Sequence, residues 1–316
     1  MRAHSGLVTA ADRTTTSGVW TGSRRRPVGR RALVGYAFVA PAVLFLLAFA
    51  AGPFLFTLWV SLHDWNMLSP IGEMPYRGLE NYRYLLFDDP LFRETFQNTV
   101  VFAIGNVGSS VVLALAIALA LNGPVRFRAF WRAAFFLPYV TSAVAVSIVW
   151  ANLYQPSYGL FNGLLDLTGL PPLRFLSSTD QALPSVIAVA VWHGVGYYMI
   201  IFLAGLQAIP GEVQEAATLD GATAWHRFWT ITLPLLRPTL LFVIVVNTLA
   251  SLQVFDLIYI LTGGGPVNAT NTLVLYMYDT AFNFLRMGRA TAMAVLLFLV
   301  IFVMTLIQFR LLREKE

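Results

Sequence analysis

Six long apolar stretches constrain the fold of this chain more than any other feature of its sequence. They cover about residues 32–62, 99–121, 133–153, 184–206, 239–261 and 290–309. Each reaches the ~20 residues that a helix needs to cross ~30 Å of hydrocarbon. The sequence therefore predicts an all-α polytopic membrane protein with six transmembrane helices.

The composition agrees with a membrane protein and excludes several other classes. Hydrophobic residues make up 57% of the chain and charged residues 12%, whereas soluble domains contain about 25% charged residues. The chain has no cysteine, which excludes disulfides, thiolate zinc sites and cysteine nucleophiles. Lys315 is the only lysine, so no P-loop lysine is available and the chain is not expected to bind ATP itself.

The first apolar stretch has an alternative interpretation as a signal peptide, because Ala48-Phe49-Ala50 resembles a cleavage site. It begins after about 31 residues and continues to Val60, which is longer than a signal-peptide core. We therefore expect a retained helix with kinks at Pro41 and Pro53. Residues 1–31 are expected to form a disordered, arginine-rich cytoplasmic leader, and residues 32–316 a single transmembrane domain.

The distribution of basic residues predicts the orientation in the membrane. Fifteen arginines and lysines lie in the leader, the loops after the second and fourth stretches, and the C-terminal tail, whereas six lie in the other loops. By the positive-inside rule both termini are cytoplasmic. Of the external loops, residues 63–98 are long enough for a small helical cap, and residues 154–183 are rich in turn-forming residues.

The cytoplasmic loop of residues 207–238 has the pattern of two short helices joined by a turn. Residues 211–219 follow Pro210 and are expected to be helical, and Asp220-Gly221 supplies a turn. A second helix is expected over residues 222–232, ending before Pro234. The alternative is an amphipathic interfacial helix, because Trp225, Phe228 and Trp229 are unfavourable in water without a partner.

Several motifs resemble those of permease subunits of binding-protein-dependent ABC importers. The run from Glu215-Ala216-Ala217 through Asp220-Gly221, followed by Ile231-Thr232-Leu233-Pro234, is similar to the EAA loop of that family. Other matches indicate the carbohydrate-uptake group and the first subunit of a maltose- or glycerol-phosphate-type permease pair. These are Gly78-Leu79-Glu80-Asn81-Tyr82, Phe135-Phe136-Leu137-Pro138 and Leu261-Thr262-Gly263-Gly264-Gly265-Pro266.

The resemblance implies a set of partners and a role for the EAA loop. A second permease subunit, two cytoplasmic ATPase subunits and an extracytoplasmic solute-binding protein would complete an importer in a bacterial plasma membrane. The loop would be a coupling helix docked in the ATPase, with Glu215 paired to a basic residue, Ala216 and Ala217 allowing close approach, and Asp220 and Gly221 forming the turn. The chain itself would be no enzyme and hold no cofactor, since ATP and Mg²⁺ would bind the ATPase.

Polar residues inside the apolar stretches are candidates for a substrate path. His193 and Tyr197 share one helix face by their i, i+4 spacing, as do Asn247 and Ser251 at the same depth in the next helix. Such faces near the middle of the membrane are typical of transporter sites. The alternative is that Asn247 and Ser251 only link helices and that His193 is a packed neutral imidazole.

The resemblance supports this location. His193, Gly194 and Tyr197 are similar to sugar-contacting positions of the maltose permease, as are Asn247, Ala250, Ser251 and Val254, with Gln253 beside them. Trp150, Trp192 and Phe255 are further candidates because aromatic rings stack on sugar faces. Asp256 is the only carboxylate in the six stretches and is expected to have a structural partner or belong to an outer gate.

The sequence favours an ATP-driven sugar importer over the alternatives. Glycerol-phosphate import remains open, although no arginine or lysine in the apolar stretches suits an anion. A stand-alone secondary carrier would need no coupling loop. A membrane-embedded enzyme would need a catalytic motif such as His-Glu-x-x-His, and none occurs. The four histidines show no metal-ligand spacing, and the dispersed arginines argue against nucleic-acid binding.

Overall fold

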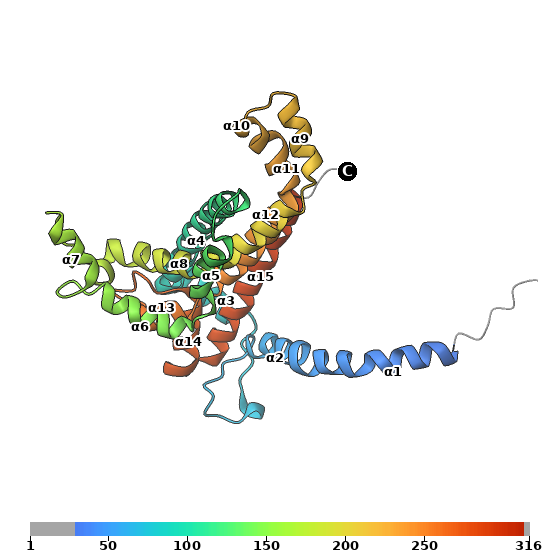
Figure 1. Ribbon diagram of the computed structural model, residues 1–316. Helices are drawn as coiled ribbons and strands as arrows, with labels where there is room; N and C mark the ends of the chain where they lie inside the picture. The colour runs from blue at the N-terminus through green and yellow to red at the C-terminus, as the bar shows by residue number, and fades with distance from the viewer. Residues whose placement is uncertain (1–28, 313–316) are drawn as a thin grey trace, which may run out of the picture. The chain divides into compact units, whose positions relative to one another are not determined.

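The computed structural model describes residues 29–312, which are almost entirely helical (Figure 1). In this part of the chain the only extended pairing is an isolated antiparallel bridge between His63 and Tyr76. Residues up to Pro53 and residues from Phe54 onward form two structural units. The predicted leader lies outside the described residues except for its last three, which begin α1 (Gly29–Leu46).

Four helical segments of residues 29–312 are long and apolar enough to cross a membrane. They are Gly35–Val60, Pro90–Asn122, Thr179–Gln207 and Met287–Arg310. The first comprises α1, a π-helical turn (Leu47–Ala51) and α2 (Gly52–Val60), and the others correspond to α4 (Pro90–Asn122), α8 (Thr179–Gln207) and α15 (Met287–Leu312). Two bent helix pairs qualify only when each is taken as one span, which gives four to six spans.

The third predicted helix is broken. It consists of α5 (Arg128–Val140) and α6 (Ala143–Leu153), which meet at 95°. Pro138 lies in the last turn of α5, where it removes one backbone hydrogen bond, and Thr141 then adopts an extended conformation. The break places Tyr139 and Ala143 at the same corner.

Two interruptions occur along the segment of the fifth predicted helix, the first just before its predicted start at residue 239 and the second within it. The segment Ala224–Leu235 meets α12 (Arg237–Leu252) at 68°. At its other end α12 stops at Leu252, the backbone is unwound over residues 253–255, and α13 (Asp256–Leu261) follows. No proline or glycine lies in this second interruption.

The helix α4 begins nine residues before the apolar stretch that predicted it. Asp89 caps its N-terminus, because its Oδ1 accepts hydrogen bonds from the backbone N–H groups of Leu91 (3.0 Å) and Phe92 (3.1 Å). Pro90 occupies the first turn, where its missing N–H costs little. The Oδ2 of Asp89 accepts a hydrogen bond from the Tyr276 hydroxyl at 2.7 Å, which ties α4 to α14 (Leu273–Tyr278). Burial, and then this bond, raise the pKa of Tyr276.

The core of the second unit forms where α4, α8 and α12 pack together. Small residues allow the close approach: a Cβ on Gly196 would lie 1.8 Å from the carbonyl oxygen of Phe135 in α5, and one on Gly205 would lie 2.5 Å from Thr239 Oγ1. Met199, Phe202, Leu236 and Val243 fill the space between the helices and are fully buried.

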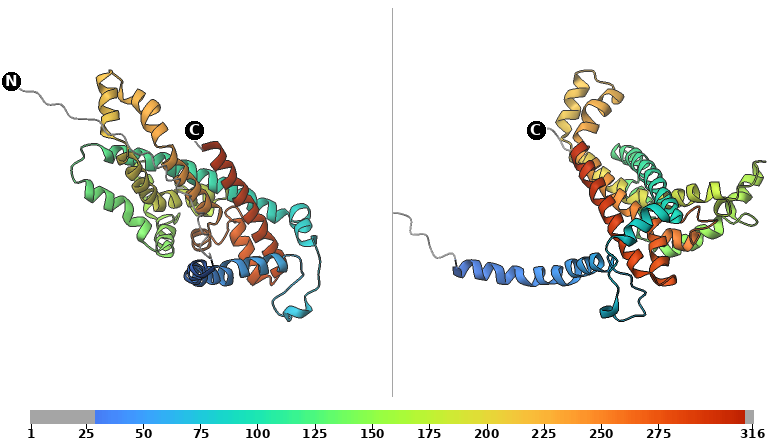
Figure 2. Two further views of the ribbon diagram at one scale, coloured as in Figure 1. Left: turned by 90° about the vertical axis from the view of Figure 1, so that its right-hand side faces the viewer. Right: turned by 180° about the vertical axis from the view of Figure 1, so that it is seen from behind.

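A helical hairpin projects beyond the end of α12 (Figure 2). It contains α9 (Gly211–Leu219), α10 (Ala224–Arg227), a π-helical turn (Phe228–Thr232) and α11 (Leu233–Leu235). The expected stop before Pro234 is not observed, because this proline sits in the first turn of α11, where it is tolerated. The break falls at Leu236 instead.

Short elements occupy the remaining loops. The loop of residues 63–98 contains α3 and two single turns, as expected for a small helical cap, and the loop of residues 154–183 contains α7, where only turns were expected. The bounds are Ile71–Glu73 and Phe175–Ser177 for 3-10 turns, Tyr84–Asp88 and Asp279–Asn283 for π-helical turns, Glu80–Arg83 for α3 and Leu160–Leu167 for α7.

Candidate functional site

A cavity of ≈260 Å³ lies where α4, α8, the α5–α6 corner and the end of α12 meet. Four of the seven predicted substrate residues line it: His193, Gly194, Ser251 and Gln253. Asn106, Tyr139 and Asp256 add further polar groups, and Phe102 and Phe255 add aromatic surface. The walls therefore combine uncharged hydrogen-bonding groups and one carboxyl group, that of Asp256, with apolar rings.

The unwound backbone after α12 forms one wall of this cavity. Residues 253–255 leave the helix at Leu252, and the next helix begins at Asp256. The side chains of Gln253 and Asp256 are exposed, and that of Gln253 makes no hydrogen bond to the described residues. Gln253 is thus free to bind a polar solute.

A buried polar cluster joins α4 to α12 at the cavity wall. Asn106 Nδ2 donates hydrogen bonds to Asn247 Oδ1 (3.1 Å) and Ser251 Oγ (2.9 Å), and Ser110 Oγ donates to Asn106 Oδ1 (3.2 Å). Asn247 is 0% exposed and does not line the cavity. Its Nδ2 is buried without a partner among residues 29–312.

Two roles were left open for Asn247 and Ser251, to line a substrate path or to link helices, and the two residues differ in this respect. Asn247 links helices in this structure, whereas Ser251 both links helices and lines the cavity. Sequence reasoning missed Asn106, the donor at the centre of the cluster. Its spacing of four residues from Ser110 in an apolar stretch was an available signal.

Tyr139 lies beside His193 in the cavity wall and is itself supported by Tyr197. Tyr197 stacks on Tyr139 with ring centroids 4.5 Å apart, and Tyr139 also lies 6.0 Å from the ring of His193. Tyr197 therefore supports a lining residue and does not line the cavity itself. His193 Nε2 lies 3.3 Å from the carbonyl oxygen of Thr141, which can only accept a hydrogen bond.

Trp150 lies apart from the cavity, in a separate aromatic cluster. Its ring packs against Trp192 (5.3 Å between centroids) and Phe161 (5.6 Å). It lines a second, mainly apolar cavity of ≈570 Å³ together with Tyr154 and Phe175. The structure therefore brings Trp150 together with Trp192, another candidate, and away from the residues that line the ≈260 Å³ cavity.

The predicted coupling residues lie on the hairpin. Glu215, Ala216 and Asp220 are exposed, whereas Ala217 is buried. Gly221 turns the chain with φ +78°, a conformation that strains other residues. The hairpin also exposes large apolar groups, since Leu219 is 89%, Trp225 71% and Trp229 50% exposed. Such a surface outside the long helices is typical of a docking site.

Two side-chain contacts hold α9 against the returning half of the hairpin. Gln214 Nε2 donates a hydrogen bond to Thr232 Oγ1 at 3.3 Å. One turn later, the Arg227 guanidinium donates to Thr218 Oγ1, which itself donates to the carbonyl oxygen of Gln214 at 2.7 Å. Neither Arg227 nor Thr232 was among the predicted coupling residues.

A cavity between packed apolar helices and a helical hairpin beyond them define a polytopic α-helical membrane protein. The chain belongs to the family described as binding-protein-dependent transport system inner membrane component, which it matches over residues 110–315. The resemblance drawn from the EAA-type loop is thereby confirmed at the level of the family.

Among the described residues, no group of three His, Asp or Glu side chains could hold a metal ion.

Similar proteins of known name and structure cover nearly the whole chain. The trehalose/maltose transport system permease protein MalF of Thermococcus litoralis is 35% identical over 91% of this chain and 96% of its own length. The sn-glycerol-3-phosphate transport system permease protein UgpA of Agrobacterium fabrum is 33% identical over 90% and 96%. The crystal structure of a bacterial alginate ABC transporter in complex with an alginate pentasaccharide-bound periplasmic protein contains a chain with the same fold. That chain aligns at TM-score 0.77 and 24% identity, over 90% of this chain and 95% of its own.

Proposed function

We propose that the chain is the transmembrane permease subunit of an ATP-driven importer that moves a neutral sugar, a di- or oligosaccharide, into the cell. The family match carries this proposal, and the trehalose/maltose relative supports the substrate class. The cavity adds chemical support, because hydroxyl groups suit Asn106, Ser251 and Gln253 and sugar ring faces suit Phe255.

In this proposal six spans cross the bacterial plasma membrane with both termini in the cytoplasm. They are the four long helical segments, the bent α5–α6 pair, and α12 continued by α13. A second permease subunit, two ATPase subunits and an extracytoplasmic binding protein complete the importer. ATP and Mg²⁺ bind the ATPase subunits. The α9–α11 hairpin is then cytoplasmic, and its exposed residues Glu215, Ala216, Asp220 and Gly221 contact the ATPase. Ala217, also predicted to do so, is buried within the chain.

The proposal includes alternating access, which the continuation of the hairpin into the cavity wall supports. The hairpin leads through the fully buried Leu236 into α12, whose 16 residues span about 24 Å at 1.5 Å per residue. At the far end of α12 lie Ser251 and Gln253. Closure of the ATPases moves the hairpin, and α12 carries that motion to the cavity, switching it between the two sides of the membrane.

Glycerol-phosphate import is the second candidate, because the sn-glycerol-3-phosphate permease relative is almost as similar to the chain. A phosphate is disfavoured by the charge of the cavity. Asp256 is a carboxylate, and no arginine or lysine is among the lining residues. A stand-alone carrier is a more distant alternative, which predicts uptake by the isolated chain in liposomes.

Co-purification tests the importer assignment. The tagged chain is extracted from its native membrane in mild detergent, and its partners are identified for the wild type, a Glu215→Arg/Gly221→Asp variant, and an Asp166→Arg control on the exposed face of α7. We expect the wild type and the control to retain an ATPase and a second permease, and the variant to lose only the ATPase. Sugar-stimulated ATP hydrolysis by the wild-type complex completes the test. A wild type that purifies alone, from membranes that contain the ATPase, would contradict the proposal.

A further inference from the structure

Tyr198 is a cavity residue for which the sequence predicted no role. It lies on α8, is 6% exposed and lines the ≈260 Å³ cavity. Its hydroxyl makes no hydrogen bond with residues 29–312, whereas buried hydroxyl groups normally have a partner. The unused hydroxyl therefore indicates a partner that is not part of this chain.

Close packing fixes the ring of Tyr198. A Cβ added to Gly194, one turn earlier in α8, would lie 3.4 Å from Tyr198 Cε2, so the ring lies directly against this turn of the helix. The ring of Tyr197 packs edge-on against it, with 5.3 Å between the centroids. Because the ring is already held in place, little side-chain entropy is lost when a solute binds the hydroxyl.

Asp256 supplies a second unused group. It is the first residue of α13 and also lines the cavity. Its carboxylate makes no hydrogen bond and no ion pair with residues 29–312. A carboxylate only accepts hydrogen bonds, and its two oxygens can accept from two donors at once. Two hydroxyl groups on adjacent carbons of a sugar ring present such a pair of donors.

Asn106 and Ser251 differ from these two residues, because their donors are used inside the protein. The Nδ2 hydrogens of Asn106 go to Asn247 and Ser251, and Ser251 Oγ donates to the carbonyl oxygen of Asn247 at 2.7 Å. Asn106 and Ser251 can therefore only accept hydrogen bonds from a solute. Further recognition falls to groups with unused capacity, such as Tyr198 and Asp256.

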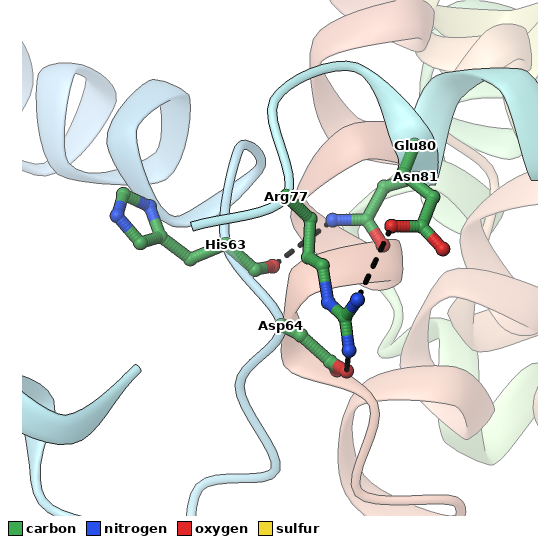
Figure 3. A network of polar contacts seen from close by, with 5 residues as sticks. All are labelled: His63, Asp64, Arg77, Glu80 and Asn81. Carbon is green, nitrogen blue, oxygen red and sulfur yellow. Dashed lines mark hydrogen bonds and ion pairs between the residues drawn. The ribbon is translucent and has the colours of Figure 1, made fainter. Parts of the chain in front are cut away.

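Polar groups that stabilise the fold are paired within the chain, as the network around α3 shows (Figure 3). Asn81 is buried, and its Nδ2 donates to the carbonyl oxygen of His63 at 3.0 Å. Arg77 lies between Asp64 (4.0 Å) and Glu80 (3.7 Å). The two unused cavity groups lack such partners, so a role in the fold does not account for them.

We propose that Tyr198 and Asp256 determine which sugars the cavity accepts. The Asp256 carboxylate accepts hydrogen bonds from two adjacent hydroxyl groups of one sugar ring, and the Tyr198 hydroxyl bonds a further sugar oxygen. This inference rests on the proposed function and deepens it. The substrate class becomes neutral sugars with a free pair of adjacent hydroxyl groups, because a sugar without that pair would leave the carboxylate unpaired.

The experiment measures the initial rate of ATP-dependent uptake into proteoliposomes that contain the whole importer, at one subsaturating concentration of sugar-loaded binding protein. The probes are maltose, trehalose and lactose, and the monodeoxy derivatives of those that the wild type imports. We expect Asp256→Asn to lower uptake of the parent sugar by about tenfold and Tyr198→Phe by about fivefold, because hydrogen bonds to charged groups are the stronger ones. Asp166→Asn and Tyr158→Phe, at exposed positions, are the matched controls and should equal the wild type.

The deoxy derivatives separate recognition from a general structural effect. The loss caused by Asp256→Asn should shrink for the two derivatives that lack a hydroxyl of the recognised pair, and stay at about tenfold for the others. The same binding protein serves every measurement, so its own selectivity cancels in the ratio of variant to wild type. An equal loss for every derivative would refute recognition by Asp256. Wild-type uptake by either variant would refute the role of that residue.

Further outcomes separate this inference from the proposed function. If the wild type imports none of the three sugars, the proposed function fails and the inference fails with it. If Asp256→Asn no longer co-purifies with the second permease, the carboxylate belongs to the interface between the subunits, and the inference is refuted while the importer assignment stands. Tyr198→Phe keeps the ring and removes no internal hydrogen bond, so its thermal unfolding midpoint should equal that of the wild type. A lower midpoint would assign the hydroxyl to the fold and refute its role in recognition.

Discussion

Asn106 donates a hydrogen bond to Asn247 across the contact of α4 with α12, at an Nδ2–Oδ1 distance of 3.1 Å. Asn106 also lines the ≈260 Å³ cavity, whereas Asn247 is fully buried. The same side chain therefore both joins two helices and faces the cavity. Motion of α12 relative to α4 must break or remake this bond.

The bond should be measurable as a coupling free energy. In a double-mutant cycle of Asn106→Ala and Asn247→Ala, we expect the two changes to be coupled by about 0.6 kcal/mol, the average for hydrogen bonds within membrane proteins. The free energy of unfolding in mixed detergent micelles gives the four values. Ser109→Ala, an exposed neighbour on α4, serves as the control and should show no coupling to Asn247→Ala. Additivity of the Asn106 and Asn247 changes would refute the link.

Gln253 should affect transport without affecting stability. Its side chain faces the cavity and makes no hydrogen bond to the described residues, so Gln253→Ala removes a solute contact and no internal one. We expect about a fivefold rise in the half-maximal sugar concentration for uptake, the effect of one lost hydrogen bond, and an unchanged unfolding transition. Asn247→Ala should show the reverse pattern. A destabilised Gln253→Ala chain with wild-type uptake would contradict the assignment.

The sequence predicted the apolar helices better than their interruptions. Length and hydropathy located the apolar stretches that lie within α4, α8 and α15, because a span must be long and apolar. The unwinding at Gln253 occurs without proline or glycine, and no local signal marks it. The early start of α4 could have been predicted, since Asp89-Pro90 is a recognisable helix N-terminus.

The candidate site was predictable only where one helix supplied its residues. Spacing placed Asn247 and Ser251 on one face, but it could not show that Ser251 reaches a cavity while Asn247 is covered by α4. Asn106 lies 141 residues from Asn247 in the sequence. Its contact with Asn247 depends on which helices pack together. Trp150 was selected only because aromatic rings stack on sugars. Its packing against Trp192 places it outside the ≈260 Å³ cavity.

Gly196 should tolerate no side chain. A Cβ there would lie 1.8 Å from the carbonyl oxygen of Phe135, so Gly196→Ala must push α5 away from α8 and disturb the corner that carries Tyr139. We expect a loss of about 1–3 kcal/mol of stability, as for other overpacked sites, seen as a lower thermal unfolding midpoint in detergent. Gly108→Ala is the matched control, because no atom lies within 4 Å of its added Cβ. Equal midpoints for the two variants would show that the helices can separate at no cost.

Arg227 should set the efficiency of coupling without being needed for assembly. Its guanidinium binds Thr218 across the hairpin, and the loss of this contact lets α9 move without moving α11 and α12. In Arg227→Ala and Thr218→Val complexes we expect the ATPase to co-purify normally and to hydrolyse ATP, while fewer sugars are transported per ATP. The double variant should be no worse than either single one, because both remove the same contact. His226→Ala, the exposed neighbour of Arg227, should transport as the wild type does. An unchanged ratio of sugar to ATP in both single variants would mean that the hairpin is held by Gln214 and Thr232 alone.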